Sequence, residues 1–187
     1  MRAVVQRVAS ASVSVDGDVI SSISRGLMVL VGIGTDDTLA DVETLSNKIL
    51  SLRVFSDDRG GMWKASVKDI AGEVLCVSQF TLMANTTKGN KPDFHRAMSS
   101  ESSRQLYSVL LEKMRRLYVA DRIQDGQFGA TMNVSLMNEG PVTFTLDTRK
   151  FEYVTANSSS GGLAKSAKGA GTTKHSFNPE ESGVADS

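Results

Sequence analysis

Asn138-Glu139-Gly140-Pro141-Val142-Thr143 is the stretch that decides the fold, because it places a Gly-Pro step between two runs with the alternation of β-strands. Residues 128–136 before it and 142–146 after it alternate hydrophobic side chains with smaller or polar ones. Proline has no backbone N–H to donate, so Pro141 must lie at a strand end, at a sheet edge or in a bulge. Backbone carbonyls near it are then free to accept other partners. A hairpin turn is the simplest interpretation of this dipeptide taken alone.

A second informative stretch, Val74-Leu75-Cys76-Val77-Ser78-Gln79-Phe80-Thr81-Leu82, starts with hydrophobic side chains on both faces. That pattern predicts a central strand that is covered on both sides. The polar groups of Ser78, Gln79 and Thr81 follow at its carboxyl end. In layered α/β proteins ligands bind at this end of the strands, because side chains and backbone there face a crevice between loops. We therefore expect a binding site at this end.

With both stretches in view, the chain resembles the D-aminoacyl-tRNA deacylase family. The likeness covers about the first 150 residues, in order and at family spacing, which is more specific than any single motif. The matching segments are Met1–Val8, Ala11–Val13, Lys48-Ile49, Ser78–Leu82, Lys88-Gly89, Phe128–Ala130, Gly140–Thr143 and Leu146-Asp147. The resemblance implies an α/β fold: a single domain of mixed, curled β-sheets, barrel-like, with two main helices packed outside.

Periodicity along the chain predicts the same class of domain, because strands are interrupted by two helices. Beside the two stretches above, strands are expected at residues 3–8, 11–15, 19–23, 27–33 and 53–55. One helix is expected to start at Asp37 or Thr38, and another to run from about Glu101 to Tyr118. Their predicted buried faces are Leu39, Val42, Leu45, Ile49 and Leu52 in the first and Leu106, Val109, Leu110, Met114 and Leu117 in the second.

The length of 187 residues favours one domain, followed by a tail of different composition. We expect the domain at residues 1–156. Residues 157–187 consist mainly of Ser, Gly, Ala, Lys and Thr, so we expect this tail to be disordered. No hydrophobic run is long enough to cross a bilayer and no signal region precedes the first strand, so we expect a cytoplasmic protein with no membrane partner.

Lysine plus arginine and aspartate plus glutamate number 21 each, so the net charge is zero with histidine neutral. A long track along nucleic-acid phosphates is therefore not expected, and no DNA partner is predicted. Any contact with RNA should be local. The candidate clusters are Lys88, Lys91 and Arg96 in one loop, and Lys113, Arg115, Arg116 and Arg122 near a helix end, although such clusters are more often solvated surface.

The residue types restrict the chemistry of the site. The chain has no Gly-rich phosphate loop, paired cysteines or histidine cluster, so we expect no cofactor and no metal. The single cysteine, Cys76, lies in a hydrophobic run and is interpreted as core. Classical hydrolysis needs a base, and before the tail only His95 supplies an imidazole. Thr81 is a conceivable nucleophile that lacks an evident base, and a hydrogen-bonding role in the pocket fits it better.

What the resemblance implies is chiral proofreading: hydrolysis of the ester of D-aminoacyl-tRNA, and of glycyl-tRNA because achiral glycine escapes the filter. The ribose hydroxyl next to the ester positions or activates water, so no protein base is required. A homodimer is implied, in which a cis Gly140-Pro141 bond inserts its carbonyls into the partner subunit's pocket. The resemblance assigns catalysis to Gly140, Pro141, Thr81, Ser78 and Gln79, and substrate binding to Phe80, Phe94, Ala130, Met132 and Lys88.

Two other functions stay open on the sequence alone. One is a module that binds tRNA ends and does no chemistry, and the other is a threonine-dependent hydrolase of small amides or esters. Fold likeness does not separate them, because one fold hosts many functions. The joint presence of both motifs favours the deacylase.

Overall fold

β1, Arg2–Val15, pairs with three other strands, more than any other strand in the described part of the chain. One edge pairs antiparallel with β3, Gly26–Gly32, and then with β2, Asp18–Ile23. The other edge pairs antiparallel with β6, Asn133–Asp147, along nearly the whole of β1. The predicted strands at 3–8 and 11–15 are therefore one continuous strand.

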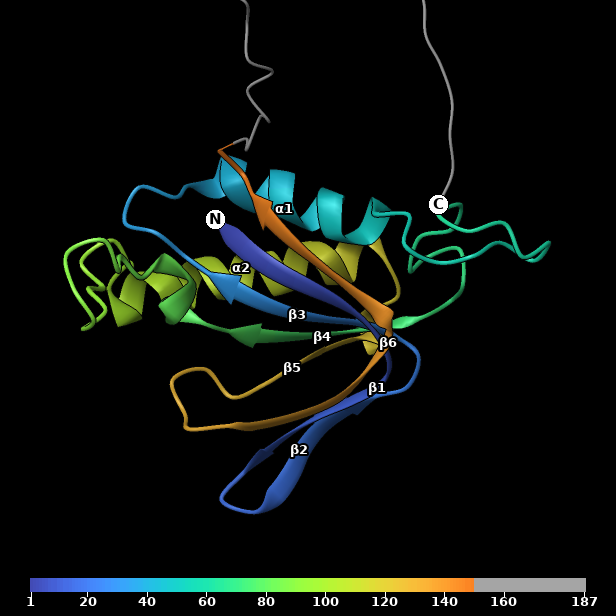
Figure 1. Ribbon diagram of the computed structural model, residues 1–187, viewed down its shortest axis with the longest axis horizontal. Coiled ribbons are helices and arrows are strands. Elements are labelled where there is room, and N and C mark those ends of the chain that lie inside the picture. Colours follow the sequence, from blue (N-terminus) through green and yellow to red (C-terminus); the bar gives the residue numbers. More distant parts are fainter. Residues whose placement is uncertain (150–187) are drawn as a thin grey trace, which may run out of the picture. The chain divides into compact units, whose positions relative to one another are not determined.

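β4, Glu73–Ser78, pairs parallel with β3, and β5, Ile123–Asp125, pairs parallel with β4. The strand order is β2-β1-β3-β4-β5, with β6 on the other edge of β1, and the mixed sheet curls on itself (Figure 1). The computed structural model describes residues 1–149, and in them the predicted fold class is confirmed. The predicted tail, 157–187, and the domain boundary at 156 lie outside the described residues.

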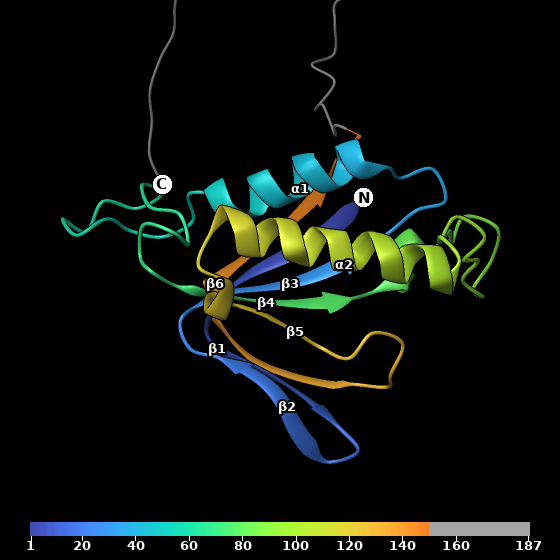
Figure 2. The same ribbon diagram turned by 180° about the vertical axis from the view of Figure 1, so that it is seen from behind.

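The helices α1, Leu39–Ser51, and α2, Ser100–Leu117, cover one face of the sheet (Figures 1 and 2). The Asp41 carboxylate accepts a hydrogen bond from the backbone N–H of Thr38 at 2.9 Å, which satisfies one donor at the start of α1. The predicted start of the first helix is thus confirmed. No helix in residues 1–149 is both long and apolar enough to span a membrane.

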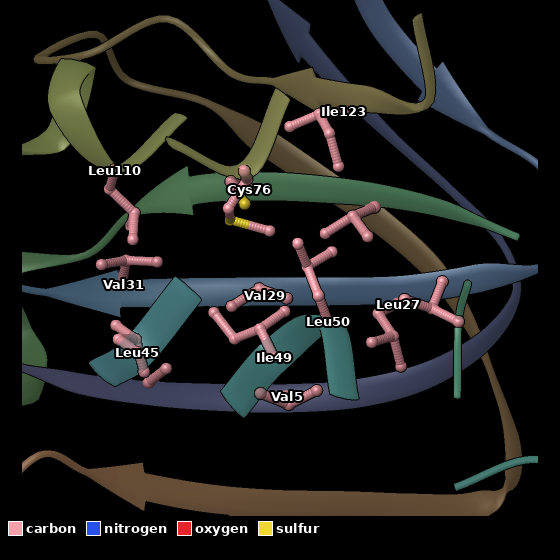
Figure 3. Packing of buried hydrophobic residues seen from close by; sticks show 14 of the residues in the cluster. Val5, Leu27, Val29, Val31, Leu45, Ile49, Leu50, Cys76, Leu110 and Ile123 are labelled. Carbon is pink, nitrogen blue, oxygen red and sulfur yellow. The ribbon is translucent and has the colours of Figure 1, made fainter. Parts of the chain in front are cut away.

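The main core lies between these helices and the sheet. Val29 and Val31 of β3 meet Ile49 of α1 and Leu110 of α2 (Figure 3). Met28, which lies between Leu27 and Val29 in the sequence, belongs to a second cluster on the opposite face of the sheet. β3 is therefore buried on both faces, as its continuous hydrophobic run predicts.

The predicted helix faces are partly wrong. Leu39 is 64% exposed, Val109 is 39% exposed and Leu117 is 37% exposed, so none of them belongs to the core. In α2, Tyr107 and Leu111 are buried instead. Periodicity identifies a hydrophobic stripe on a helix, but the position of the sheet decides which edge of that stripe is covered.

The strand expected at 74–82 is too long. β4 ends at Ser78, and Phe80–Met83 forms a 3₁₀ helix, η1. η1 packs closely on the end of β3, because a Cβ built on Gly32 would lie only 2.8 Å from the Cβ of Leu82. β3, the strand that β4 pairs with, ends at the same level, at Gly32.

Two further strand predictions are wrong, and one short strand was not foreseen. The expected strand at 53–55 is only an isolated bridge from Phe55 to Ala65. The hairpin turn that Gly140-Pro141 suggests when taken alone does not form, because β6 continues through it along β1. Residues 128–132 precede that strand rather than belong to it, and β5 has three residues, too few to show a period.

Ile49→Ala should lower the free energy of unfolding by about 2–5 kcal/mol, because Ile49 is fully buried and its truncation leaves a cavity. Leu39→Ala on the same helix is the matched control, and it should change that free energy by less than about 0.5 kcal/mol. Urea unfolding with an unchanged m value measures both effects. A loss above about 2 kcal/mol for Leu39→Ala would contradict the buried face described here.

Candidate functional site

A cavity of ≈ 600 Å³ opens at the carboxyl ends of β3 and β4. Ser78, Gln79 and Phe80 line it from the end of β4, and Ala130 and Met132 line it from the segment after β5. These strands end at the same edge of the sheet because they pair in parallel. Five of the residues predicted from the sequence therefore meet at one cavity.

Thr81 lies beside this cavity, and its hydroxyl contacts an amide rather than a base. Gln79 Nε2 donates to Thr81 Oγ1 at 2.5 Å, and the backbone N–H of Gln79 donates to the Val31 carbonyl at 2.7 Å. An amide nitrogen has no lone pair available to take a proton from a hydroxyl. The imidazole of His95 is engaged elsewhere, with Asp93 in an exposed loop. Hydrogen bonds from the His95 backbone and side chain hold the Asp93 pKa below its usual range.

A hairpin-like loop stands at the mouth of the cavity. Asn85 and Asp93 exchange backbone hydrogen bonds of 2.8 and 2.9 Å, which close the loop at its base. The next residue, Phe94, packs edge-on against Phe80 with ring centroids 5.0 Å apart. Phe80 itself stays 58% exposed, so its ring remains available at the rim. Lys88 lies exposed on the closed part of the loop and does not line the cavity.

Phe128 forms a wall of the cavity that the site prediction omitted. Tyr107 of α2 packs against its ring with centroids 5.7 Å apart, and the guanidinium of Arg104 lies 4.6 Å from the ring centroid. Arg104 Nη2 also donates to the Phe128 carbonyl at 3.5 Å. Phe128 was part of a family-like segment, but only the tertiary structure shows that α2 holds it in place.

The β1–β6 ladder is interrupted by a bulge. Four residues of β6, Glu139–Val142, stand opposite the single residue Arg7 of β1. Asn138 bridges the interruption, because its Nδ2 donates to the Arg7 carbonyl at 2.8 Å and to the Val142 carbonyl at 3.0 Å. Arg7 Nε donates to the Glu139 carbonyl at 3.2 Å. Side chains on both strands therefore satisfy carbonyls that the ladder leaves unpaired.

Gly140 and Pro141 are exposed in this bulge, and the peptide bond between them is cis. Gly140 has φ +119°, a conformation that L side chains rarely adopt. A Cβ built on Gly140 would lie 2.9 Å from Cγ2 of Val142 and 3.0 Å from Nη2 of Arg7. The position therefore requires glycine for both its backbone angle and its space.

Within one chain, the structure does not bring Gly140-Pro141 to the cavity. Arg7, opposite the step, pairs with Leu27 near the start of β3, whereas Val31 near its end lines the cavity. Val31 follows Leu27 by four residue steps, which is roughly 13 Å along a strand. The two motifs that the sequence singled out therefore lie level with opposite ends of β3.

Comparison with known proteins gives consistent matches over this domain. The family described as "D-Tyr-tRNA(Tyr) deacylase" matches residues 4–147. The D-aminoacyl-tRNA deacylase of Candida glabrata is 53% identical over 148 residues, 79% of this chain and 99% of that protein. D-aminoacyl-tRNA deacylase 1 of Danio rerio is 52% identical over 79% of this chain and 71% of its own length. A solved structure titled "c-Myc DNA Unwinding Element Binding Protein" has a TM-score of 0.77 and 52% identity, covering 79% of this chain and 98% of its own.

Cys76 should not react with iodoacetamide at neutral pH in the folded protein. Burial raises the pKa of its thiol to about 12, with a smaller contribution from the Asp125 carboxylate, so the reactive thiolate is scarce. Mass spectrometry should detect no labelling before unfolding and one label in concentrated urea, because Cys76 is the single cysteine of the chain. Rapid labelling of the native protein would contradict the core position of this residue.

Proposed function

This chain belongs to the D-aminoacyl-tRNA deacylase family and is a hydrolase of that kind, and on this premise we propose that its cavity and its Gly140-Pro141 step act together across a homodimer. The substrate is a tRNA whose 3′ end carries a D-amino acid as an ester. The products are free tRNA and the D-amino acid. One observation carries the proposal: the exposed Gly140-Pro141 step is held by side chains at the opposite end of β3 from the cavity of its own chain.

The cavity positions the ester, and the RNA itself contributes the hydroxyl that assists its hydrolysis. Water attacks the ester carbonyl, the bond from that carbon to the ribose oxygen breaks, and the ribose oxygen takes up a proton. The ribose hydroxyl next to the ester orients or activates the water. This assignment is supported by the surroundings of Thr81, whose hydroxyl contacts the Gln79 amide and no base among residues 1–149.

The residues around the cavity divide into two groups in this proposal. Ser78, Gln79 and Thr81 hold the ester and the terminal ribose through hydrogen bonds. The terminal adenosine contacts the apolar or aromatic side chains of the rim and the wall. These are Phe80, Phe94, Ala130 and Met132. Lys88, on the loop above them, meets a phosphate of the same RNA end.

Chirality is read by the backbone of Gly140-Pro141 from the partner subunit. In a two-fold dimer each chain places its step in the other chain's cavity, so both sites are completed by the same exchange. The carbonyls of the step accept from the amino group of a D-amino acid, and the bulk of the step clashes with an L side chain. Glycine carries no side chain to reject, so glycyl-tRNA is also a substrate. A tRNA substrate agrees with a cytoplasmic location.

The function is tested by comparing hydrolysis of D- and L-aminoacyl-tRNA that carry the same amino acid. We expect release of the D-amino acid alone, whereas a module that only binds tRNA ends releases neither.

Thr81→Ala should lower kcat/KM about tenfold without abolishing turnover, because it removes the free-energy contribution of one hydrogen bond. A substrate that lacks the ribose hydroxyl beside the ester should lose roughly a hundredfold or more in kcat. If Thr81 were the nucleophile of a hydrolase, Thr81→Ala would abolish turnover and the substrate without the ribose hydroxyl would still be hydrolysed.

Gly140→Ala should lower kcat/KM for D-aminoacyl-tRNA roughly a hundredfold, because the added Cβ displaces the step from its position against the substrate. Its cost in folding free energy should be only about 1–3 kcal/mol. Gly17→Ala is the matched control: Gly17 also has a positive φ, +94°, but a Cβ there meets nothing within 4 Å. The control should lose similar stability and keep full activity. Equal losses of activity in the two variants would contradict a specific role for Gly140.

A further inference from the structure

The structure separates the two basic clusters of the sequence by whether their charges are neutralised. Near the end of α2, Lys113 pairs with Glu43, Arg115 with Asp125 at 3.0 Å, and Arg116 with Glu112 at 3.2 Å. Arg122 donates to a backbone carbonyl, that of Ala71. In the loop between η1 and α2, Lys88, Lys91 and Arg96 are exposed and form no ion pair within residues 1–149. Of the two clusters, only the loop has all of its cations without an ion-pair partner among the described residues, whereas three of the four near the end of α2 are paired.

The two clusters also differ in their distance from the cavity. Ser100, the first residue of α2, lines the cavity, and Arg116 lies 16 residues further along the helix. At 1.5 Å per residue this is roughly 24 Å. The loop, by contrast, reaches the cavity directly, because Phe94 packs on Phe80 and Ala97 lines the cavity wall. In Figure 1 the loop lies beside the start of α2.

A second cavity, of ≈ 340 Å³, is lined in part by Arg96 of the loop. Three arginines line it, but Arg2 is paired with Asp147 at 3.0 Å, and Arg149 is paired with Asp36 and Asp37. Arg96 is left as the cation without an acidic partner among the described residues. Its neighbour Ala97 lines the first cavity, so Arg96 stands at the border between the two. The one carboxylate of the loop, Asp93, is held by His95.

We infer that Lys88, Lys91 and Arg96 form the surface on which the phosphates of the tRNA 3′ strand dock. This inference rests on the deacylase function and names the part of the protein that holds the RNA. A terminal nucleotide carries its ester on the ribose and its phosphate on the same sugar. With that ribose in the first cavity, the strand leaves past the loop, and its phosphates meet Arg96 first and the two lysines after it. Local phosphate contacts also agree with a chain of zero net charge.

Binding of uncharged tRNA, measured by fluorescence anisotropy over a range of salt concentrations, tests this surface. The double variant Lys88→Ala, Lys91→Ala should weaken binding about tenfold and reduce the log–log salt slope by roughly 1.4, because each lost phosphate contact removes about 0.7. Lys88→Arg, Lys91→Arg should bind like the wild type, since the charges remain. Arg96→Ala should raise KM for D-aminoacyl-tRNA by a similar factor.

The matched control is Lys113→Ala, Arg116→Ala, which removes the same charge from the neutralised cluster and should change tRNA binding less than twofold. The inference is overturned if the control weakens binding as much as the loop variant, or if the loop variant leaves the affinity and the salt slope unchanged. A wild-type protein that binds tRNA with these dependences and hydrolyses no D-aminoacyl-tRNA would overturn the deacylase mechanism and leave the docking surface supported.

Discussion

A mismatch in the β1–β6 ladder, four residues of β6 opposite the single residue Arg7, sets the geometry of the Gly140-Pro141 step. A regular ladder has no room for three extra residues, so the backbone groups between Asn138 and Thr143 need other partners. Asn138 and Arg7 provide them, and Arg7 also donates to the Val54 carbonyl at 2.6 Å. Each such bond contributes on the order of 1 kcal/mol, so together they hold the step in place as an exposed, ordered projection.

The same strand, β1, joins this projection to the cavity. Its first half pairs with β3, whose end forms part of the cavity, and its partner on the other edge is β6 with the bulge. The cavity is built from parallel strand ends and from loops, the bulge from antiparallel strands. One chain therefore carries the cavity at one end of the sheet and the exposed Gly140-Pro141 step toward the other, and this separation is what the proposed two-fold dimer with shared sites requires.

Local patterns predicted the parts of this structure that depend on local interactions. The hydrophobic run of β3, the start of α1 at Thr38, and the polar residues at the end of β4 were all found from residue types and spacing. The sequence around Gly140-Pro141 fits either a hairpin turn or a bulge within a strand. Turn propensity depends on four neighbouring residues, whereas the pairing with β1 joins residues more than 130 positions apart. The same limit hid η1, which forms where Leu82 packs against Gly32.

Two features of the site depend on contacts between residues far apart in the sequence: the pairing of its basic residues and the position of Phe128 in the cavity wall. The sequence presents two similar basic clusters, and only the structure shows that most cations of one are paired with acids, as Lys113 is with Glu43, 70 positions earlier. Phe128 likewise becomes a cavity wall through Tyr107 and Arg104 of a distant helix.

Complementation between two impaired variants tests the shared site most directly. Gly140→Ala keeps an intact cavity, and Gln79→Ala keeps an intact Gly140-Pro141 step. Mixing equal amounts under conditions of subunit exchange makes half of the dimers mixed, each with one complete site of two. The account predicts recovery to about one quarter of wild-type D-aminoacyl-tRNA hydrolysis. Activity that stays at the mean of the two variants after exchange would contradict a site completed by the partner subunit.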